Sequence, residues 1–372
     1  MGNIPGFATL EGTGKYTEKM SFQCAKEHFR LVHKLWASSI GIGTYLGKPD
    51  SATDRLVENA IVRSVQSGVN VIDTAINYRR EHGEKSVGKA LRKLLEEGVI
   101  DRAEIVLCTK GGFIPGTLGI NGFKKSYVDD PHRGIMMNDL VADCHCMHPE
   151  YLEDQLDRSL NNLGVETIDV YHIHNPETQL GPVPREIFES RLLSAFKMLE
   201  KAVEKGKIRF YGLATWSAFR VTPSNARHIS LEHVKRLAGQ AAGGKDHLGF
   251  IQLPLNLRMP EAVLVSNQDV KGKKETAIEA SLKLGIHPFI SGSIAQGDIP
   301  RLSEKLRGFL GTRLANDFQR ALQFTRSAPG IVSALTGMKR LEHVDENLRL
   351  CTVSPLESSE FLKIAGQKLI PI

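Results

Sequence analysis

Four side chains that could share a proton occur where apolar runs of the sequence end. They are Asp73 after VNVI, Tyr78 five positions later, Lys110 at the end of IVLCTK, and His174 at the end of IDVYHIH. Such runs are typical of buried strands, and the carboxyl ends of parallel strands meet at one edge. A buried Lys beside an Asp would lower the pKa of a nearby phenol from about 10 and make it a general acid near neutrality. The His would hydrogen-bond the reacting oxygen. Taken singly, an Asp at a strand end and a Tyr in a loop are also common structural features.

The chain around these residues alternates between strand-like and helix-like stretches. Eight such pairs predict an α/β protein with a (β/α)8 TIM barrel in a single domain, residues 1–372. An open doubly wound sheet would also alternate, but it would need G-x-G-x-x-G after the first strand, where the sequence reads GIGTYLG. The predicted strands are 39–45, 69–73, 104–110, 168–174, 208–214, 250–255, 287–290 and 331–336. The predicted helices are 52–66, 84–97, 149–163, 184–205, 231–241, 274–284, 314–327 and 341–350.

Composition excludes several other classes. The 372 residues are 41% hydrophobic, with a formal charge of +6, which favours a solvated basic surface over a nucleic-acid binder and still suits an anionic cofactor. An odd number of cysteines, five, argues against a disulfide framework. No secretory signal or membrane-spanning run is visible. We expect a soluble, reduced, cytoplasmic protein without membrane or nucleic-acid partners; its oligomeric state stays open.

Several segments together resemble the aldo-keto reductase superfamily. They fall in the family's order, cover roughly Ser39 to Leu350, and read NVIDTAINY, GEKSVGKAL, VLCTKGG, YLEDQLDRSLNNLGVETIDVYHIHNPE, GKIRFYGLATWS, IQLPLNL, SGSIAQG and RSAPGIVSALTGMKRLEHVDENL. The resemblance implies that Asp73, Tyr78, Lys110 and His174 form a catalytic set that reduces a carbonyl with hydride from a nicotinamide. In the family the catalytic His directly precedes an Asn-Pro or Trp-Pro step, which selects His174 over His172.

The resemblance also implies where the nicotinamide end of a cofactor lies. Thr215 and Gln252 match positions that hold the carboxamide, although Ala214-Thr215 replaces the usual Ser-Asn pair. Ser291 stands where relatives place an aromatic ring, so Trp216 or Phe289 would have to supply that surface. The glycines of the first strand let a ligand come close, which adds Gly43 and Thr44 to the cofactor set.

The phosphate end of the cofactor is expected at the start of the last helix. Backbone NH groups and cations at a helix N-terminus bind phosphates, which points to Gly337, Met338, Lys339 and Arg340. Lys339 and Arg340 would pair with an adenosine 2′-phosphate and so favour NADP(H) over NAD(H). A solvated basic helix start is the alternative. His343, Glu346 and Asn347 complete the set, and relatives hold the adenine near the last two.

Three segments depart from the regular alternation. Residues 1–36 form an N-terminal extension, in which FATLEGTGKYTEKMSF would be a hairpin turning at Gly12-Thr13-Gly14 and plugging the barrel floor, or else a free tail. Residues 351–372 form a C-terminal extension. Residues 111–148 would fold over the barrel mouth and set substrate choice, or form a disordered insert.

The substrate is expected between that long segment and Trp216. His145, Cys146 and Met147 would lie nearest to it. The spacing C-H-C-x-H is wrong for a zinc site, so no metal is expected. We therefore expect an NADP(H)-dependent oxidoreductase that interconverts an aldehyde or ketone and its alcohol. The alternatives are an enzyme that uses bound NADP(H) in an internal redox cycle (an epimerase, isomerase or lyase on a sugar-like substrate) and a cofactor-sensing regulatory subunit.

Overall fold

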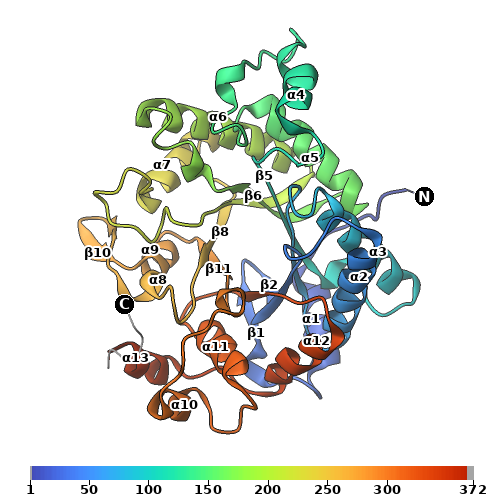
Figure 1. Cartoon of the computed structure of the whole chain (residues 1–372), viewed down its shortest axis with the longest axis vertical. Coiled ribbons are helices and arrows are strands. Elements are labelled where there is room, and N and C mark those ends of the chain that lie inside the picture. Colours follow the sequence, from blue (N-terminus) through green and yellow to red (C-terminus); the bar gives the residue numbers. More distant parts are fainter. Residues whose placement is uncertain (1, 367–372) are drawn as a thin grey trace.

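Eight parallel strands close into a barrel in the computed structural model, which describes residues 2–366 (Figure 1). Around the barrel the order is β11-β12-β3-β4-β5-β6-β7-β8. The predicted (β/α)8 fold is confirmed. The strands are β3 (Ile40–Gly43), β4 (Val71–Asp73), β5 (Val106–Gly111), β6 (Ile168–His174), β7 (Ile208–Ala214), β8 (Leu248–Pro254), β11 (His287–Ser291) and β12 (Ala334–Gly337).

Eight helices follow these strands in turn and surround the barrel (Figure 1). Each buries one apolar face; α2, for example, turns Val57, Ile61 and Val65 inward at helical spacing. The helices are α2 (Ser51–Gln66), α3 (His82–Glu96), α5 (Pro149–Leu163), α6 (Arg185–Glu204), α7 (Leu231–Ala242), α9 (Ala277–Lys283), α11 (Asp317–Arg326) and α12 (Leu341–Leu348).

The N-terminal hairpin was placed wrongly. Residues expected to turn at Gly12 form helix α1 (Leu10–Met20), and the side chain of Thr9 caps it by accepting the Gly12 amide at 2.9 Å. Glycine is required at position 12 because an added Cβ would lie 2.4 Å from the Ala103 carbonyl oxygen. A close helix-to-chain contact, rather than a turn, therefore explains this glycine.

The hairpin that does close the barrel floor consists of β1 (Phe29–Val32) and β2 (Leu35–Ser38). Its side chains Val32, Leu35 and Ala37 join the cluster that fills the barrel interior. The two-residue turn uses His33 and Lys34 at φ 48° and 61°. Such a turn usually carries Asn or Gly, so the sequence held no hairpin signal here.

In the second half of the chain, several helices and strands beyond the eight strand–helix pairs cover the outside of the barrel. The helix expected at 274–284 begins only at Ala277, because residues 273–275 pair in a hairpin; Thr276 and Glu279 then cap the helix reciprocally. In the C-terminal extension Phe361 stacks on Phe324 at 5.1 Å, and residues 367–372 lie outside the described part. The added elements are α8 (Glu261–Leu264), β9 (Gln268–Val270), β10 (Lys273–Glu275), α10 (Glu304–Leu310), η7 (Arg349–Thr352) and α13 (Ser358–Gly366).

The long segment 111–148 is folded but does not cover the barrel mouth. It contains α4 (Gly119–Phe123), which lies at the periphery beyond α5 and α6 (Figure 1). Its Tyr127 hydroxyl donates to Asp154 of α5 at 2.6 Å, and Asp139 pairs with Arg191 of α6 at 3.2 Å. A small separate core, to which α5 contributes Tyr151, holds it together: Phe123, Tyr127, Ile135, Leu140, Cys146 and Tyr151.

Candidate active site

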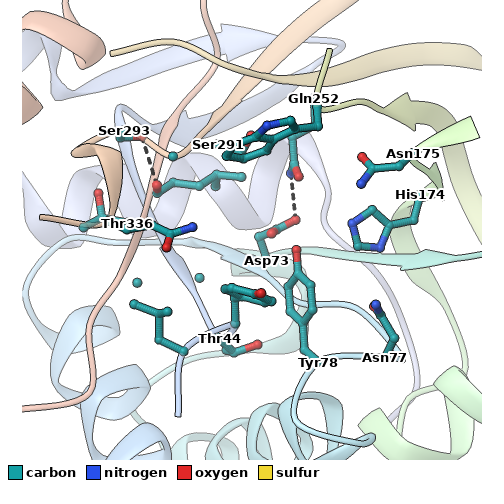
Figure 2. A pocket seen from close by; sticks show the side chains of 18 of the residues that line it. Thr44, Asp73, Asn77, Tyr78, His174, Asn175, Gln252, Ser291, Ser293 and Thr336 are labelled. Atoms are coloured by element: carbon teal, nitrogen blue, oxygen red, sulfur yellow. Dashed lines mark hydrogen bonds between the residues drawn. The ribbon is translucent and has the colours of Figure 1, made fainter. Parts of the chain in front are cut away.

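The four predicted catalytic side chains lie together at the carboxyl ends of adjacent strands. Lys110 Nζ is 2.6 Å from Asp73 Oδ2 and 3.4 Å from the Tyr78 hydroxyl. It also donates to the Thr74 carbonyl at 2.8 Å, which leaves this buried ammonium fully paired. The rings of Tyr78 and His174 meet edge to face with centroids 5.7 Å apart. Figure 2 shows Tyr78 between Asp73 and His174 on one pocket wall.

The electrostatics of Tyr78 differ from the sequence expectation. Burial raises the pKa of the Tyr78 phenol above its ordinary value and outweighs Lys110, which lowers it. The expected net lowering is therefore wrong. Burial lowers the pKa of Lys110, but Asp73 and Tyr78 more than compensate, so this ammonium stays charged. The arrangement holds a protonated phenol at neutral pH, poised to give its proton away.

The two candidate histidines occupy different depths of the barrel. His174 lines the pocket, whereas His172 is fully buried one layer below, with its ring 6.3 Å from that of Phe289. Burial and then Lys110 lower the pKa of His172 to about 3 and that of His174 well below its ordinary value. Both imidazoles are thus neutral at pH 7. Only His174 can reach a molecule in the pocket.

A cavity of about 440 Å³ opens above these residues at the carboxyl end of the barrel. Predicted residues Gly43, Thr44, Gln252 and Ser291 line it together with Trp216. Gln252 donates to the second oxygen of Asp73 at 2.9 Å, so the amide is tied directly to the catalytic set.

A second cavity of about 350 Å³ continues from the first and shares Gly43, Thr44, Leu46 and Gly337 with it. Its far wall is the start of α12, where Arg340 is the N-cap residue. Within residues 2–366 neither Lys339 nor Arg340 enters an ion pair. The two cavities form one elongated cleft with a cationic end, lined there by Met338, Lys339, Arg340 and His343.

Comparison with known proteins agrees with this geometry. The model of the aldo/keto reductase family matches residues 39–228, which is just over half of the chain. The chain belongs to the aldo/keto reductase family. It is 24% identical to aldo-keto reductase family 4 member C11 of Arabidopsis thaliana, over 70% of this chain and 78% of that protein.

Further relatives and solved structures share the fold of this aldo/keto reductase. An uncharacterized oxidoreductase, YqkF, of Bacillus subtilis is 23% identical over 87% of this chain and 90% of its own. A crystal structure of an aldo/keto reductase from Klebsiella pneumoniae in complex with NADP and acetate superimposes with a TM-score of 0.61 at 18% identity, covering 93% of this chain and 97% of that one.

Some predicted residues of this aldo/keto reductase lie away from the cleft. His145, Cys146 and Met147 are buried and do not line the cavity, so their assignment nearest the substrate is wrong. His145 Nε2 instead bonds the backbone carbonyl of His174 at 2.8 Å, and burial lowers the pKa of His145 to about 4. His145 therefore supports the strand end that carries His174.

Three expected cofactor residues also lie off the described cavity walls. Thr215 is buried, and its hydroxyl has no hydrogen-bond partner among the described residues. Glu346 accepts a hydrogen bond from Asn316, and Asn347, the next residue of α12, is buried. Neither lines the second cavity.

Four further residues line the pocket that the sequence analysis did not select. Asn77 and Asn175 flank the Tyr78–His174 pair (Figure 2), and Tyr45 and Phe113 add aromatic surface. Asn77 Oδ1 is buried without a partner in the described structure, and Asn175 has a left-handed backbone, φ 46°. Their adjacency to Tyr78 and His174 in the chain was the available signal.

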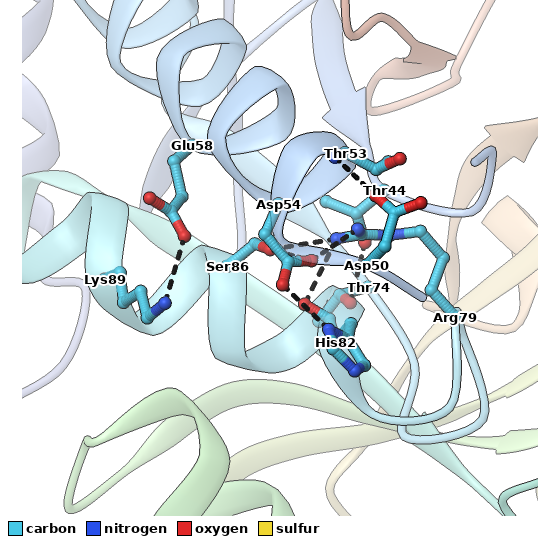
Figure 3. A network of polar contacts seen from close by, with 10 residues as sticks. All are labelled: Thr44, Asp50, Thr53, Asp54, Glu58, Thr74, Arg79, His82, Ser86 and Lys89. Atoms are coloured by element: carbon cyan, nitrogen blue, oxygen red, sulfur yellow. Dashed lines mark hydrogen bonds and ion pairs between the residues drawn. The ribbon is translucent and has the colours of Figure 1, made fainter. Parts of the chain in front are cut away.

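The loop after Tyr78 is held by a polar network (Figure 3). Arg79, Arg80 and Glu81 all have positive φ, at 48°, 55° and 72°. Asp54 of α2 accepts from Arg79 at 2.7 Å and pairs with His82 at 2.8 Å. Left-handed backbone costs about 1–2 kcal/mol per residue, so this loop conformation needs such anchoring.

Proposed function

We propose that this protein is an NADP(H)-dependent oxidoreductase that interconverts an aldehyde or ketone and the corresponding alcohol. The observation that carries the proposal is the contact of Lys110 Nζ with both Asp73 Oδ2 (2.6 Å) and the Tyr78 hydroxyl (3.4 Å), at the floor of the cleft. The partner is a small carbonyl or alcohol molecule, and neither a nucleic acid nor a membrane is part of the proposal. No described helix is both long and apolar enough to cross a bilayer.

The cleft fits a dinucleotide with a 2′-phosphate. Its lining includes Gln252, whose amide bonds Asp73, and Thr336, whose buried Oγ1 has no partner in the described structure. Lys339 and Arg340 stand at the other end, without carboxylate partners there. NADPH bound in this cleft supplies the hydride. Gln252 would hold its carboxamide, and Lys339 and Arg340 its 2′-phosphate.

Side chains of the protein would transfer the proton that the reaction requires. Tyr78 donates its hydroxyl proton to the carbonyl oxygen during reduction and takes it back during oxidation. Lys110 stabilises the phenolate that results, since its ammonium is held charged by Asp73. Neutral His174 hydrogen-bonds the carbonyl oxygen and fixes its direction. Gln252 keeps the Asp73 carboxylate in place through its 2.9 Å bond.

We also assign Trp216 to the nicotinamide wall rather than to the substrate alone. Phe289, the other candidate, is fully buried and stacks on Phe250 at 5.1 Å, away from the cleft. Trp216 is 45% exposed, and its ring edge approaches Gly292 so closely that an added Cβ there would lie 3.9 Å away. The indole thus reaches toward Ser291, where the ring of the relatives is missing.

The walls near Tyr78 favour an uncharged polar substrate. The lining of the larger cavity contains no Lys or Arg apart from the machinery beneath it. Asn77 and Asn175 offer amide donors and acceptors on the His174 side. A carbonyl compound with neighbouring hydroxyl groups would satisfy them, whereas a carboxylate would meet no cation.

The test is steady-state consumption of NADPH, followed by its absorbance, across a panel of aldehydes and ketones. We expect turnover on at least one uncharged carbonyl and a loss of roughly 10²- to 10⁴-fold in Tyr78→Phe, with NADPH affinity nearly intact. Near-normal turnover of Tyr78→Phe would refute the proton role. NADPH binding without net consumption would favour an internal redox cycle if a sugar-like substrate is converted, and a sensing subunit if none is.

A further inference from the structure

Two cysteines from opposite ends of the chain meet outside the active site. Cys24 lies between α1 and β1, and Cys351 lies in η7 near the C-terminus. The amide of Ala25 donates to the carbonyl of Cys351 at 2.7 Å, so the two backbones run against each other. The Cys24 thiol itself donates to the Ser67 carbonyl at 4.0 Å, and the Cys351 thiol is close enough to lower the pKa of Cys24. Backbones joined in this way fit the short Cα spacing that a disulfide requires.

The two thiols differ in access to solvent. Cys351 is 1% exposed, whereas Cys24 is partly exposed at the surface of the molecule. Gly68 leaves room for the Cys24 sulfur, because an added Cβ at this glycine would lie 2.4 Å from it. A small reagent can therefore reach the Cys24 thiol before it reaches the buried Cys351 thiol.

A buried cation lies near this pair, because the Arg326 guanidinium donates to the carbonyl of Val353, two residues beyond Cys351. The Arg326 guanidinium is fully buried and bonds neutral acceptors, Gln323 Oε1 at 2.7 Å and Ser39 Oγ at 3.3 Å. No carboxylate pairs with it in residues 2–366. An uncompensated buried charge is costly, so a neighbouring anion would be stabilised.

Of the two cysteines, the partly exposed Cys24 is the one whose thiol pKa is lowered. The hydrogen bond from the Cys351 thiol, and then the Arg326 charge, lower the pKa of the Cys24 thiol against the opposing effect of burial. Burial lowers the pKa of Arg326 to about 9, which still leaves the guanidinium charged at neutral pH. The other titratable groups around the pair are Tyr16, His28, Arg30 and Glu104.

We propose that Cys24 and Cys351 form a redox couple, in which a peroxide oxidises the exposed thiol and the buried thiol then closes a disulfide between the two ends of the chain. The Cys24 thiolate attacks hydrogen peroxide and becomes a sulfenic acid, releasing hydroxide. The Cys351 sulfur displaces the sulfenic oxygen, which leaves as water after proton transfer. Two thiols and one peroxide thus give one disulfide and two waters.

The disulfide would link the segment that follows α12 to the segment that contains Cys24. η7 follows α12 directly, and the Cys24 segment leads into the hairpin that closes the barrel floor. Linking them joins residues far apart in sequence, which restricts the unfolded chain. We expect the oxidised protein to melt at a higher temperature than the reduced one.

The experiment is limited peroxide treatment of the full chain, followed by alkylation, intact mass and peptide mapping. We expect a mass loss of two hydrogens and one cross-linked peptide pair containing Cys24 and Cys351. Before oxidation, a limiting alkylating agent should label Cys24 faster than Cys144. Cys144 is the matched comparison: it is also partly exposed, but burial and Asp143 raise the pKa of its thiol, and no cation among the described residues lowers it.

Two variants complete the design. Cys24→Ser should not form the cross-link, and oxidation should not raise its melting temperature. Cys144→Ser should form the cross-link and melt at a higher temperature after oxidation, as the unaltered chain does. Equal alkylation of Cys24 and Cys144 would overturn the proposal, as would a disulfide mapped to another pair or terminal sulfinic acid at Cys24 without any link. The map of the unaltered chain decides the question even if a variant fails to fold.

Discussion

Replacing Asp54 with Asn should slow turnover although Asp54 touches neither cofactor nor substrate. Asp54 holds Arg79, the residue after Tyr78, at 2.7 Å, and the Arg79 side chain is only 1% exposed. Asn keeps an oxygen that can accept from Arg79 but removes the charge. The buried guanidinium would then lose its counter-ion next to three residues with positive φ.

The size of the effect follows from burial. Breaking a fully buried ion pair costs about 3–5 kcal/mol. Asp54 is 14% exposed and Asn preserves part of the hydrogen bonding, so we expect a loss of about 2–3 kcal/mol in unfolding free energy. If the loosened loop misplaces the Tyr78 hydroxyl by about 1 Å, turnover should fall by up to roughly 10²-fold.

The assay pairs thermal unfolding with steady-state kinetics. Because the phenol acts only in proton transfer, kcat should fall while NADPH affinity stays unchanged. Asp50→Ala is the matched control: Asp50 caps the same helix by accepting the Thr53 amide at 2.8 Å and, among the described residues, forms neither a hydrogen bond nor an ion pair with Arg79. Losing that cap should cost about 1 kcal/mol of stability and leave kcat alone. Equal kcat values for Asp54→Asn and Asp50→Ala would refute the positioning argument.

The same pair predicts a pH dependence. Burial raises the pKa of Asp54, but hydrogen bonds from His82 and Arg79 more than compensate, so its pKa lies below the ordinary value. A lowered folded-state pKa contributes stability that is present above the unfolded value of about 3.9 and is lost as the pH falls through the folded value. Below that range the unaltered protein and Asp54→Asn should approach equal stability in acid unfolding.

Two further predictions concern the cleft. Replacing Lys339 and Arg340 together with Ala should weaken NADPH binding by about 1–3 kcal/mol and hardly change NADH binding, because only the former carries a 2′-phosphate; equal losses in titrations with both cofactors would contradict the phosphate role. His174→Ala should lower turnover more than His172→Ala, which should chiefly lower the melting temperature, because His172 is buried below the pocket floor. The reverse ranking in parallel kinetic and melting measurements would show that the wrong histidine was chosen.

The catalytic set could be predicted because barrel topology does most of the positioning. Asp73, Lys110 and His174 end or nearly end strands that neighbour one another in the closed sheet, so alternating strands and helices bring them together. The order of the strands alone brings these three residues together, and side-chain conformation changes their placement little. The direction of the Tyr78 pKa shift was missed because burial and the Lys110 charge act in opposite senses, and their balance depends on depth below the surface.

The positions of long segments outside the barrel could not be predicted from the sequence in the same way. Segment 111–148 leaves and returns at the catalytic rim, which suggested a lid, yet Tyr127, Asp139 and Arg191 anchor it to the outer helices instead. Those anchors are a few polar contacts between residues far apart in sequence. No local sequence pattern predicts these contacts. Of the described residues in the segment, Phe113 is the one that lines the larger cavity.

The position of Tyr78 shows how the two kinds of information combine. A phenol five residues past Asp73 identifies the proton donor, but nothing in INYRREHGEK indicates that the next three residues adopt left-handed backbone. That conformation exists because Arg79 turns inward to Asp54 and Glu81 pairs with Arg158 of α5. The barrel strands therefore fix Asp73, Lys110 and His174, while ion pairs to α2 and α5 fix Tyr78 against them. A change in either helix that disturbs these pairs should alter catalysis before it alters the fold.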